Sequence, residues 1–414
     1  MSTMSKNSRM ADVVIVGAGA AGLFAAVTAA KRGLQVLLLE RNDRIGKKLA
    51  ITGKGRCNVT NACPPEEILK NIPRNGRFLY SSVYGFTPEQ VMAFFEENGC
   101  PLKIERGNRV FPVSDRSGDI IAVLDRQLKR YGVERRQERV IGLFVQDGKI
   151  AAVKTEKGII SARRVLLCTG GASYPLTGST GDGYELARSV GHRIVPPTGS
   201  LVPLLSTDDC GKMQGLSLRN TELKLLDSKN KVVFKDFGEL LFTHFGLSGP
   251  MALSASAHLK EGMTYRVVLD LKPALDEGKL DARFLRDLEK YANRSMENAL
   301  ADLYPHSMIS VLLERCGIDS TMQANSLTKQ QRRCLLEQTK AFSLPVLGTR
   351  PVEEAIITRG GVDVKEIDPK TMESKLIEGL FFAGELLDCD AYTGGFNLQI
   401  AWSTAYAAAN GWEK

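Results

Sequence analysis

The chain has 414 residues, of which 43% are hydrophobic and 25% are charged, and it carries a formal net charge of +8. A chain of this length predicts two to three domains with a sizeable core, and these proportions exclude a disordered or fibrous protein. The basic balance favours anionic partners such as nucleotides, RNA or carboxylates, but it does not select one of them.

The eight cysteines are irregularly spaced and form no Cys-x-x-Cys pair. This pattern argues against a bound metal or a disulfide scaffold, and it predicts reduced thiols in a cytoplasmic protein. Glycines interrupt the apolar run near the start of the chain, which indicates a strand and a turn rather than a signal peptide. No apolar stretch reaches the length of about 18 residues that a membrane-spanning helix needs, so we expect no membrane insertion.

The first predicted element is a buried strand over residues 12–16, and a glycine-rich turn and a helix to about Arg32 follow it. A second buried strand is predicted over residues 35–40 and ends at Glu40. In this strand–turn–helix context the glycines form a dinucleotide-binding fingerprint, in which the helix N-terminus faces the pyrophosphate and Glu40 accepts hydrogen bonds from a ribose. A glycine turn without a ligand is the alternative. The predicted loop consists of Gly17, Ala18, Gly19, Ala20, Ala21 and Gly22.

The middle of the chain alternates between short strands and helices. Helices are expected over residues 88–98 and 118–131, and strands over 140–153 and 159–167. Beyond Pro196-Pro197, short alternating runs to residue 271 predict a β-rich insert, and residues 274–340 have the periodicity of a helical subdomain. The chain then returns to strands at 355–358 and 380–383, and a helix is expected over 401–410.

The fingerprint alone does not separate FAD from NAD, because both contain an ADP half. Glu385 stands directly behind the strand that ends at Gly384, as the ribityl chain and pyrophosphate of FAD require, whereas a plain NAD dehydrogenase would not need the C-terminus to return. The Thr169-Gly170-Gly171 turn forms either a second wall of this site or a simple strand exit. The sequence therefore predicts an α/β fold. A Rossmann-like, glutathione-reductase-like FAD-binding domain (1–195 and 346–414) is interrupted by a β-rich insert (196–272) that carries a helical subdomain (273–345).

Five runs of the sequence are similar to those of one flavoprotein family. On these runs the chain resembles the BaiN/YhiN/YtfP-like flavoproteins, which are also described as aminoacetone-oxidase-like. A small departure is Phe396, where tyrosine is common, but an aromatic ring is kept. The matching runs span nearly the whole chain and cover residues 14–22, 53–61, 169–171, 241–250 and 384–399.

The resemblance implies that Glu40 binds the adenosine ribose of FAD and that the backbone near Val140 meets the adenine. It also implies that Glu385, Asn397 and Leu398 lie along the ribityl chain and the isoalloxazine. The sequence contains no second fingerprint, so NAD(P)H would dock only transiently as the reductant. Beyond the glycine loop, the predicted FAD contacts are Glu40, Arg41, Lys48, Cys57, Asn58, Val140, Thr169, Gly170, Gly384, Glu385, Gly395, Asn397 and Leu398.

A bound flavin supplies hydride chemistry, while the protein positions the substrate and supplies a proton. The candidate catalytic residues are His244, Tyr392 and Cys57, and for each of them a purely structural role is the alternative. Members of the resembled family act on 3-oxo bile acids with Δ4 or Δ6 unsaturation, on a uridine of ribosomal RNA, or on aminoacetone with oxygen. The first two substrates share a C=C bond conjugated to a carbonyl, so we expect a reductase of a small-molecule enone.

The run over residues 173–183 is most similar to the branch of the family from low-GC Gram-positive anaerobes, which favours the bile acid. RNA is the second choice of partner. The basic residues over 126–136, and the cations and rings that alternate over 74–80, would suit RNA or form a solvated helix face and a packed loop. A flavin with only a structural or redox-sensing role is a further alternative, and the sequence predicts no oligomeric state.

Overall fold

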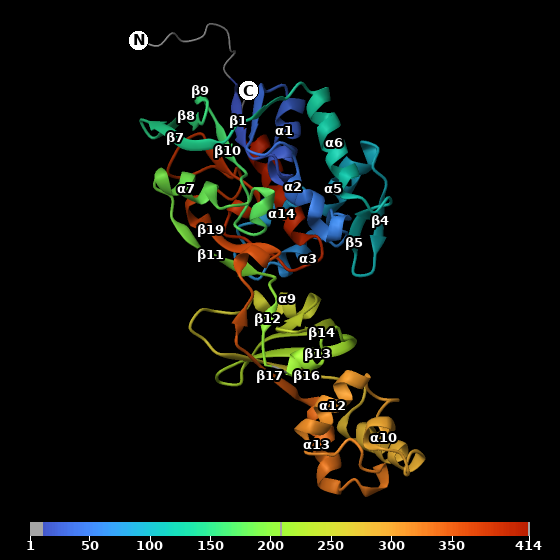
Figure 1. Cartoon of the computed structure of the whole chain (residues 1–414). Helices are drawn as coiled ribbons and strands as arrows, with labels where there is room; N and C mark the ends of the chain where they lie inside the picture. The colour runs from blue at the N-terminus through green and yellow to red at the C-terminus, as the bar shows by residue number, and fades with distance from the viewer. Residues whose placement is uncertain (1–10, 208, 413–414) are drawn as a thin grey trace. The chain divides into compact units, whose positions relative to one another are not determined.

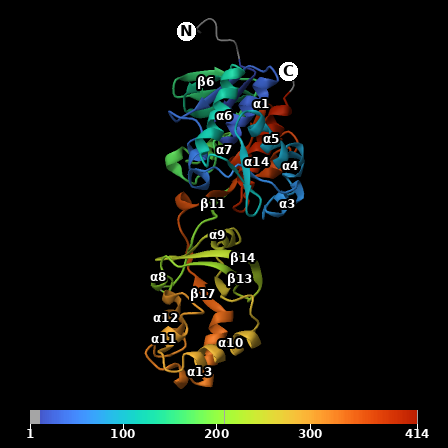
Figure 2. The same ribbon diagram turned by 90° about the vertical axis from the view of Figure 1, so that its right-hand side faces the viewer.

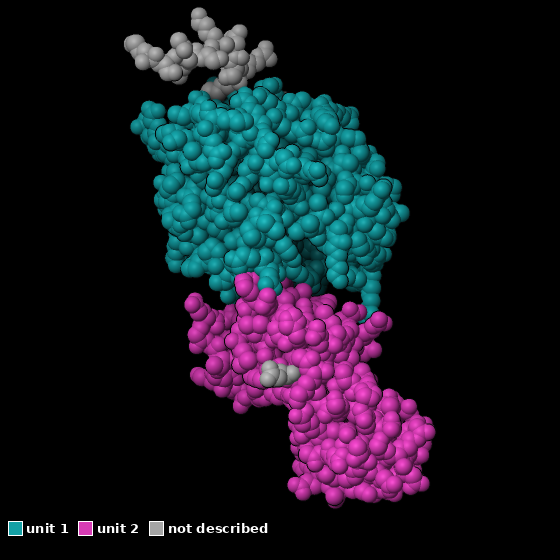
Figure 3. Space-filling view, in the orientation of Figure 1, with its two compact units in different colours: residues 1–200, 352–414 teal, residues 201–351 magenta. Residues whose placement is uncertain are grey.

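The computed structural model describes residues 11–207 and 209–412, so the first ten residues of the predicted FAD-binding segment lie outside the described residues. Two compact units divide the chain: residues 1–200 with 352–414 form unit 1, and residues 201–351 form unit 2 (Figure 3). Each unit has a hydrophobic core of its own. The finer division of the insert at residue 273 stays a prediction.

The centre of unit 1 is a five-stranded sheet in the order β20-β10-β1-β2-β6, in which every neighbouring pair is parallel. All residues of β1, β10 and β20 are buried, as expected of a parallel sheet that is covered on both faces. The C-terminal part of the chain supplies β20, so both ends of the sequence build one sheet. The strands are β1 (Val13–Val16), β2 (Val36–Glu40), β6 (Glu134–Gln137), β10 (Val165–Leu167) and β20 (Leu380–Phe382).

Two helices that are far apart in the sequence pack side by side in unit 1: α1 (Ala20–Lys31) and α14 (Phe396–Asn410) (Figure 1). Alanine is the commonest residue in both helices, and its small side chain allows close packing. Phe24 of α1 and Trp402 of α14 meet edge to face, with ring centroids 5.6 Å apart. The other helices of unit 1 are α2 (Lys47–Ile51), α3 (Pro65–Lys70), α4 (Tyr80–Gly85), α5 (Pro88–Glu97), α6 (Ser117–Arg130) and α7 (Asp182–Ser189).

Three smaller sheets complete unit 1. Strands β11 (Ile194–Ser200) and β19 (Ile357–Val362) pair antiparallel where the chain leaves unit 1 and where it returns. The sequence predicted β7 and β8, but it missed the small sheet within residues 51–113, whose strands have at most four residues each. The remaining strands are β3 (Thr60–Asn61), β4 (Leu102–Glu105), β5 (Arg109–Pro112), β7 (Val140–Gln146), β8 (Lys149–Thr155) and β9 (Gly158–Ser161).

Unit 2 combines a seven-stranded antiparallel sheet, in the order β17-β16-β13-β14-β15-β12-β18, with a group of helices (Figure 2). The predicted fold class, an α/β FAD-type domain interrupted by a β-rich insert that carries helices, is thereby confirmed. The strands are β12 (Leu204–Leu205), β13 (Ser217–Asp227), β14 (Val232–Thr243), β15 (Gly246–Ser248), β16 (Tyr265–Asp270), β17 (Phe342–Val346) and β18 (Gly348–Thr349). The helices are α8 (Asp209–Lys212), α9 (Pro250–Ser256), α10 (Glu277–Lys290), α11 (Met296–Ala299), α12 (His306–Arg315) and α13 (Lys329–Lys340).

Within residues 11–207 and 209–412, no helix is both long and apolar enough to cross a membrane. The same residues contain no group of three or more His, Cys, Asp or Glu side chains that could hold a metal ion.

A buried histidine ties together three separate segments of unit 1. The Nδ1 atom of His192 lies 3.0 Å from Oε2 of Glu366, and its Nε2 atom lies 2.8 Å from Oγ of Ser374. This arrangement resembles a hydrolase triad, but the Ser374 oxygen accepts hydrogen bonds from the N–H groups of Leu376 and Ile377 at 3.0 and 2.9 Å. Because these bonds occupy both of its lone pairs, the hydroxyl group is a structural donor to His192 and not a nucleophile.

Replacing His192 by Asn should reduce the loss of stability on mild acidification. Burial lowers the pKa of His192, although Glu366 opposes part of this shift. The folded pKa therefore lies below the unfolded value of about 6.5, so the unfolded chain binds the proton first. The contribution of His192 is complete above about pH 6.5 and is lost as the pH falls below that value. The difference between the urea midpoints measured at about pH 7.5 and at about pH 5.5 should be smaller for His192→Asn than for wild type. An equal difference in both proteins would contradict this account.

Candidate functional site

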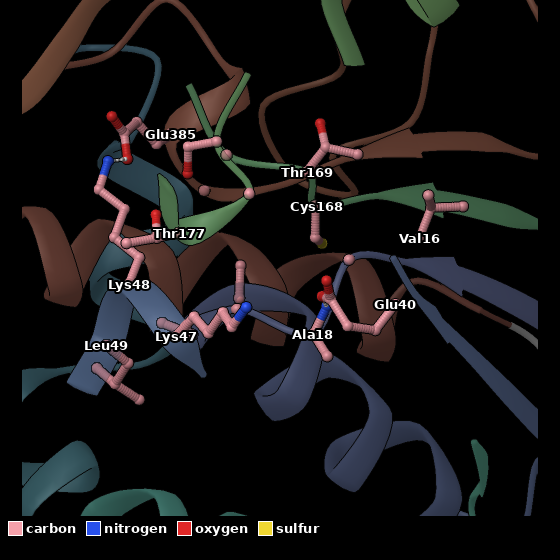
Figure 4. Close-up of a pocket in the computed structure, with 18 of the residues that line it drawn as sticks. Val16, Ala18, Glu40, Lys47, Lys48, Leu49, Cys168, Thr169, Thr177 and Glu385 are labelled. Carbon is pink, nitrogen blue, oxygen red and sulfur yellow. Dashed lines mark hydrogen bonds and ion pairs between the residues drawn. The ribbon is translucent and has the colours of Figure 1, made fainter. Parts of the chain in front are cut away.

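A pocket lies at the carboxyl ends of four strands of the parallel sheet, where ligands bind in open α/β folds (Figure 4). Val16 ends β1 there, Leu39 lies near the end of β2, and Cys168 and Ala383 directly follow β10 and β20. The empty space between its lining residues, part of which is open to solvent, is about 1270 Å³.

Each glycine of the fingerprint loop has a different physical requirement. Gly17 has φ +101°, and a Cβ atom there would lie 2.5 Å from the carbonyl oxygen of Cys168. A Cβ atom at Gly22 would lie 1.9 Å from the carbonyl oxygen of Gly17, whereas one at Gly19 would meet no atom within 4 Å. Gly17 and Gly22 therefore allow the helix and the strands to pack. Gly19 leaves bare backbone facing the pocket, and α1 begins directly behind it without a side-chain cap, so its free N–H groups can bind an anion.

Glu40 ends β2 beside this loop and points its carboxylate at it (Figure 4). One oxygen accepts a hydrogen bond from the N–H of Ala18 at 2.7 Å. The other accepts from the backbone and the side chain of Asn42 at 2.9 and 2.7 Å. These bonds fix the carboxylate at the wall of the pocket, and a carboxylate offers about four acceptor positions in all, so one is left for a ligand hydroxyl.

An ion pair forms another part of the pocket wall (Figure 4). The Nζ atom of Lys48 on α2 lies 2.6 Å from Oε2 of Glu385 and 2.7 Å from Oγ of Ser173. The other oxygen of Glu385 accepts from the Ser173 hydroxyl at 3.0 Å and from the N–H of Thr358 at 2.9 Å. Gly171 makes this arrangement possible, because a Cβ atom there would lie 2.3 Å from Oγ1 of Thr358.

Thr169 places an unpaired polar atom at the pocket. It lines the pocket, and its hydroxyl oxygen is buried without a hydrogen-bond partner among the described residues. Buried hydroxyl groups are rarely left unpaired, so this one is suited to a ligand oxygen. Bare N–H groups, a carboxylate for a ribose and an unpaired hydroxyl group together fit the phosphates and hydroxyls of FAD.

Most of the predicted cofactor residues are brought together in this pocket. Gly22, Cys57, Asn58 and Gly395 are not among the lining residues that the structure describes. Gly395 instead joins the Asn58 loop to α14, since a Cβ atom there would lie 2.3 Å from the carbonyl oxygen of Thr60. The predicted residues that line the pocket are Gly17, Ala18, Gly19, Ala20, Ala21, Glu40, Arg41, Lys48, Val140, Thr169, Gly170, Gly384, Glu385, Asn397 and Leu398.

The three predicted catalytic residues do not occur among the described lining residues of this pocket. His244 is exposed in unit 2, directly after β14, and its ring packs on Phe245 with centroids 4.9 Å apart. Tyr392 is half-buried in unit 1, and its backbone N–H donates to the carbonyl of Asn71 at 3.0 Å. Burial raises the pKa of Cys57 to about 12, so its thiol stays protonated at neutral pH and is a poor nucleophile. The catalytic roles of all three stay predictions.

Sequence reasoning missed one side of the pocket. Arg139 lines it together with Arg41, and so do Thr177, Gly178, Ser179 and Asp182. The signal in the sequence was the pair Gly178 and Gly181, both of which have positive φ. Glycines show that the chain turns, but not which residues it turns toward.

Comparison with known proteins identifies the family. Residues 11–411 match the model of the HI0933-like protein Rossmann domain. The chain belongs to the HI0933-like family. This match confirms the resemblance noted in the sequence. The HI0933-like proteins are flavoprotein oxidoreductases with a Rossmann-type FAD-binding domain, and the chain is an enzyme of this kind.

Two curated relatives span nearly the full length of this HI0933-like protein. The 3-dehydro-bile acid delta(4,6)-reductase of Clostridium scindens is 32% identical, over 96% of this chain and 98% of the relative. A ribosomal RNA dihydrouridine synthase of Haemophilus influenzae is 30% identical, over 97% of this chain and 98% of the relative. Among solved structures, the Mycobacterium smegmatis Sdh1 complex in the apo form has a TM-score of 0.51 at 20% identity, covering 97% of this chain and 68% of that chain. This last likeness shows the fold alone.

Proposed function

We propose that this HI0933-like protein uses FAD to reduce a C=C bond conjugated to a carbonyl, with hydride derived from NAD(P)H. The observation that carries the proposal is the full-length likeness to a reductase, at 32% identity. The first substrate candidate is a 3-oxo steroid of the bile-acid type with Δ4 or Δ6 unsaturation. When bound, FAD supplies the chemistry that takes hydride from NAD(P)H and passes it to the C=C bond.

The residues of the pocket have distinct tasks in this proposal. The glycine loop would hold the pyrophosphate, Glu40 the adenosine ribose, and Thr169 and Glu385 the ribityl hydroxyls. Asn397 fixes the segment before α14, because its side chain bonds both the N–H and the carbonyl of Ala391, at 2.9 and 2.8 Å. The N-terminus of α14 has no side-chain cap, so its positive end would favour negative charge on a cofactor bound beside Asn397 and Leu398.

The charged segments that suggested RNA are largely engaged within the protein. Lys129 lies 2.6 Å from Asp125, which also pairs with Arg135. Arg74 binds both carboxylate oxygens of buried Asp388, at 2.7 and 2.9 Å. These cations contribute less positive surface than the sequence suggests, which supports a small molecule as the first substrate candidate.

A uridine of ribosomal RNA is the second candidate, favoured by the Haemophilus influenzae relative. The 5,6 double bond of uracil is conjugated to a carbonyl, so the same hydride addition applies. Oxidation of an aminoacetone-type amine by oxygen is the third candidate. We propose that the reaction takes place in the cytoplasm, where the irregularly spaced cysteines of the sequence would stay reduced.

An anaerobic assay separates these candidates. NADH or NADPH should be consumed when a 3-oxo-Δ4 steroid is added, but not with the saturated 3-oxo steroid as control, and the product should be two hydrogens heavier than the substrate. The substrate would be RNA and not a steroid if two results occurred together. No Δ4 or Δ6 steroid would be reduced, and deletion of the gene would remove dihydrouridine from ribosomal RNA. Turnover that requires oxygen and an amine would instead identify an oxidase.

A further inference from the structure

The segment 174–182, here called the strap, connects the Lys48–Glu385 side of the pocket to the side that contains Glu40 and Arg41. It begins directly after Ser173, which binds Lys48 and Glu385, and it ends at Asp182, the first residue of α7. Its inner residues Thr177, Gly178, Ser179 and Asp182 line the pocket, whereas the Leu176 side chain is 95% exposed. The strap therefore lies between this part of the pocket and the solvent.

Asp182 forms a clamp between the strap and two arginines that line the pocket. Its Oδ2 atom lies 3.0 Å from Nη1 of Arg41 and 2.9 Å from Nη2 of Arg139. Its Oδ1 atom accepts from the Thr180 hydroxyl at 2.6 Å, and Arg41 also donates to Thr180 at 2.7 Å. Arg41 follows β2 and Arg139 precedes β7, so the clamp connects the strap to the part of the pocket that contains Glu40.

A second contact holds the middle of the strap against the same wall. The side-chain amide of Asn42, which also binds Glu40, donates to the carbonyl of Thr177 at 3.1 Å. A Cβ atom at Gly178 would lie 2.4 Å from this amide nitrogen. Gly178 also has φ +100°, so glycine is required there both by the close approach and by the backbone conformation.

We propose that the strap closes over the Glu40 end of the FAD pocket, and that the ion pairs of Asp182 with Arg41 and Arg139 hold it closed and so control the release of FAD. Asp182 is then a positioning residue, because it acts through the strap and not by contact with a substrate. The inference rests on the proposed use of FAD. It makes the dissociation of the dinucleotide depend on breaking two partly exposed ion pairs, which salt screens.

Asp182→Asn tests the strap, since the amide keeps the size of the side chain but cannot form ion pairs. The holoenzyme is mixed with an excess of an apoflavoprotein that captures FAD, and the rise or fall of flavin fluorescence gives the release rate. We expect release at least tenfold faster than in wild type, and Arg139→Gln should show the same change. Rising NaCl should accelerate release from wild type but not from Asp182→Asn. The melting temperature of the apoprotein should fall only slightly, because the ion pairs of Asp182 are partly exposed.

Glu185→Gln provides a matched control on the same helix, because Glu185 pairs with Arg188 and does not line the pocket. Its release rate should equal that of wild type. Release rates of Asp182→Asn and Arg139→Gln within twofold of wild type would overturn the strap while leaving FAD binding intact. Wild-type protein that binds no FAD would overturn the proposed function, and the role of the strap with it.

Discussion

Gly19→Ala should weaken FAD binding by at least about a hundredfold, or about 2.7 kcal/mol, while the apoprotein melts as wild type does. A methyl group at Gly19 meets no protein atom within 4 Å, so it creates no clash and costs the fold little, but it would occupy the space that we assign to the pyrophosphate. Gly22→Ala should instead destabilise the fold. Its methyl group would lie 1.9 Å from the carbonyl oxygen of Gly17, and overpacking of this kind costs about 3 kcal/mol.

Thermal denaturation of the apoproteins and calorimetric titration with FAD measure the two effects separately. For a unit of this size, 3 kcal/mol corresponds to a fall in melting temperature of about 6–12 °C for Gly22→Ala. Gly85→Ala is the matched control, because a methyl group there also meets nothing within 4 Å and Gly85 does not line the pocket. Gly19→Ala protein that binds FAD as tightly as Gly85→Ala would contradict the placement of the cofactor.

Lys48→Met should destabilise the apoprotein by about 1–3 kcal/mol, because it leaves the Glu385 carboxylate without its cation. The side chains of Lys48 and Glu385 are only 20% and 12% exposed, so water replaces the lost partner poorly. Fully buried pairs lose about 3–5 kcal/mol on such a change, and the contact with the pocket reduces this value. The double variant Lys48→Met/Glu385→Gln should regain part of the stability, since no charge is then left unpaired and the amide oxygen can still accept from the N–H of Thr358.

Urea unfolding of wild type, both single variants and the double variant gives the coupling energy of the pair. Lys47→Met is the matched control, because Lys47 is the neighbour of Lys48 and pairs with the exposed Asp43 at 3.2 Å. Exposed ion pairs of that kind contribute only about 0.2–1 kcal/mol. If Lys48→Met lowers the free energy of unfolding no more than Lys47→Met does, the ion pair at the pocket is not structurally important.

The fold was predictable where the sequence signal is local and continuous. The buried runs of β1, β2 and β20 are short, apolar and next to glycines, so they read as strands of a parallel sheet. The last helix was expected from residue 401, but α14 begins at Phe396, because Gly394 and Gly395 adopt positive φ and let the chain enter the helix earlier. The short helices α2 to α4 were missed, since five or six residues carry too little periodicity.

The candidate site was predictable where strand ends build it, but not on the side that the segment 177–182 covers. Glu40 and Glu385 each follow a recognisable strand, and the ends of parallel strands meet at one edge of the sheet. The contacts of Asp182 with Arg139, and of Arg74 with Asp388, join residues that no local pattern connects. Arg74 in particular reads in the sequence as a free cation, yet its partner lies in the C-terminal part of the chain.

A single-turnover experiment under strict anaerobiosis tests the central claim most directly. The purified protein, loaded with FAD and photoreduced, is mixed with a stoichiometric amount of a 3-oxo-Δ4 steroid, and the absorbance near 450 nm is followed. The account predicts that the oxidised flavin spectrum returns and that one equivalent of the saturated ketone forms. Enone reduction would be contradicted if the flavin stayed reduced with Δ4 and Δ6 enones and with uridine-containing ribosomal RNA. Reoxidation of the same flavin by oxygen would show that the protein was active in electron transfer.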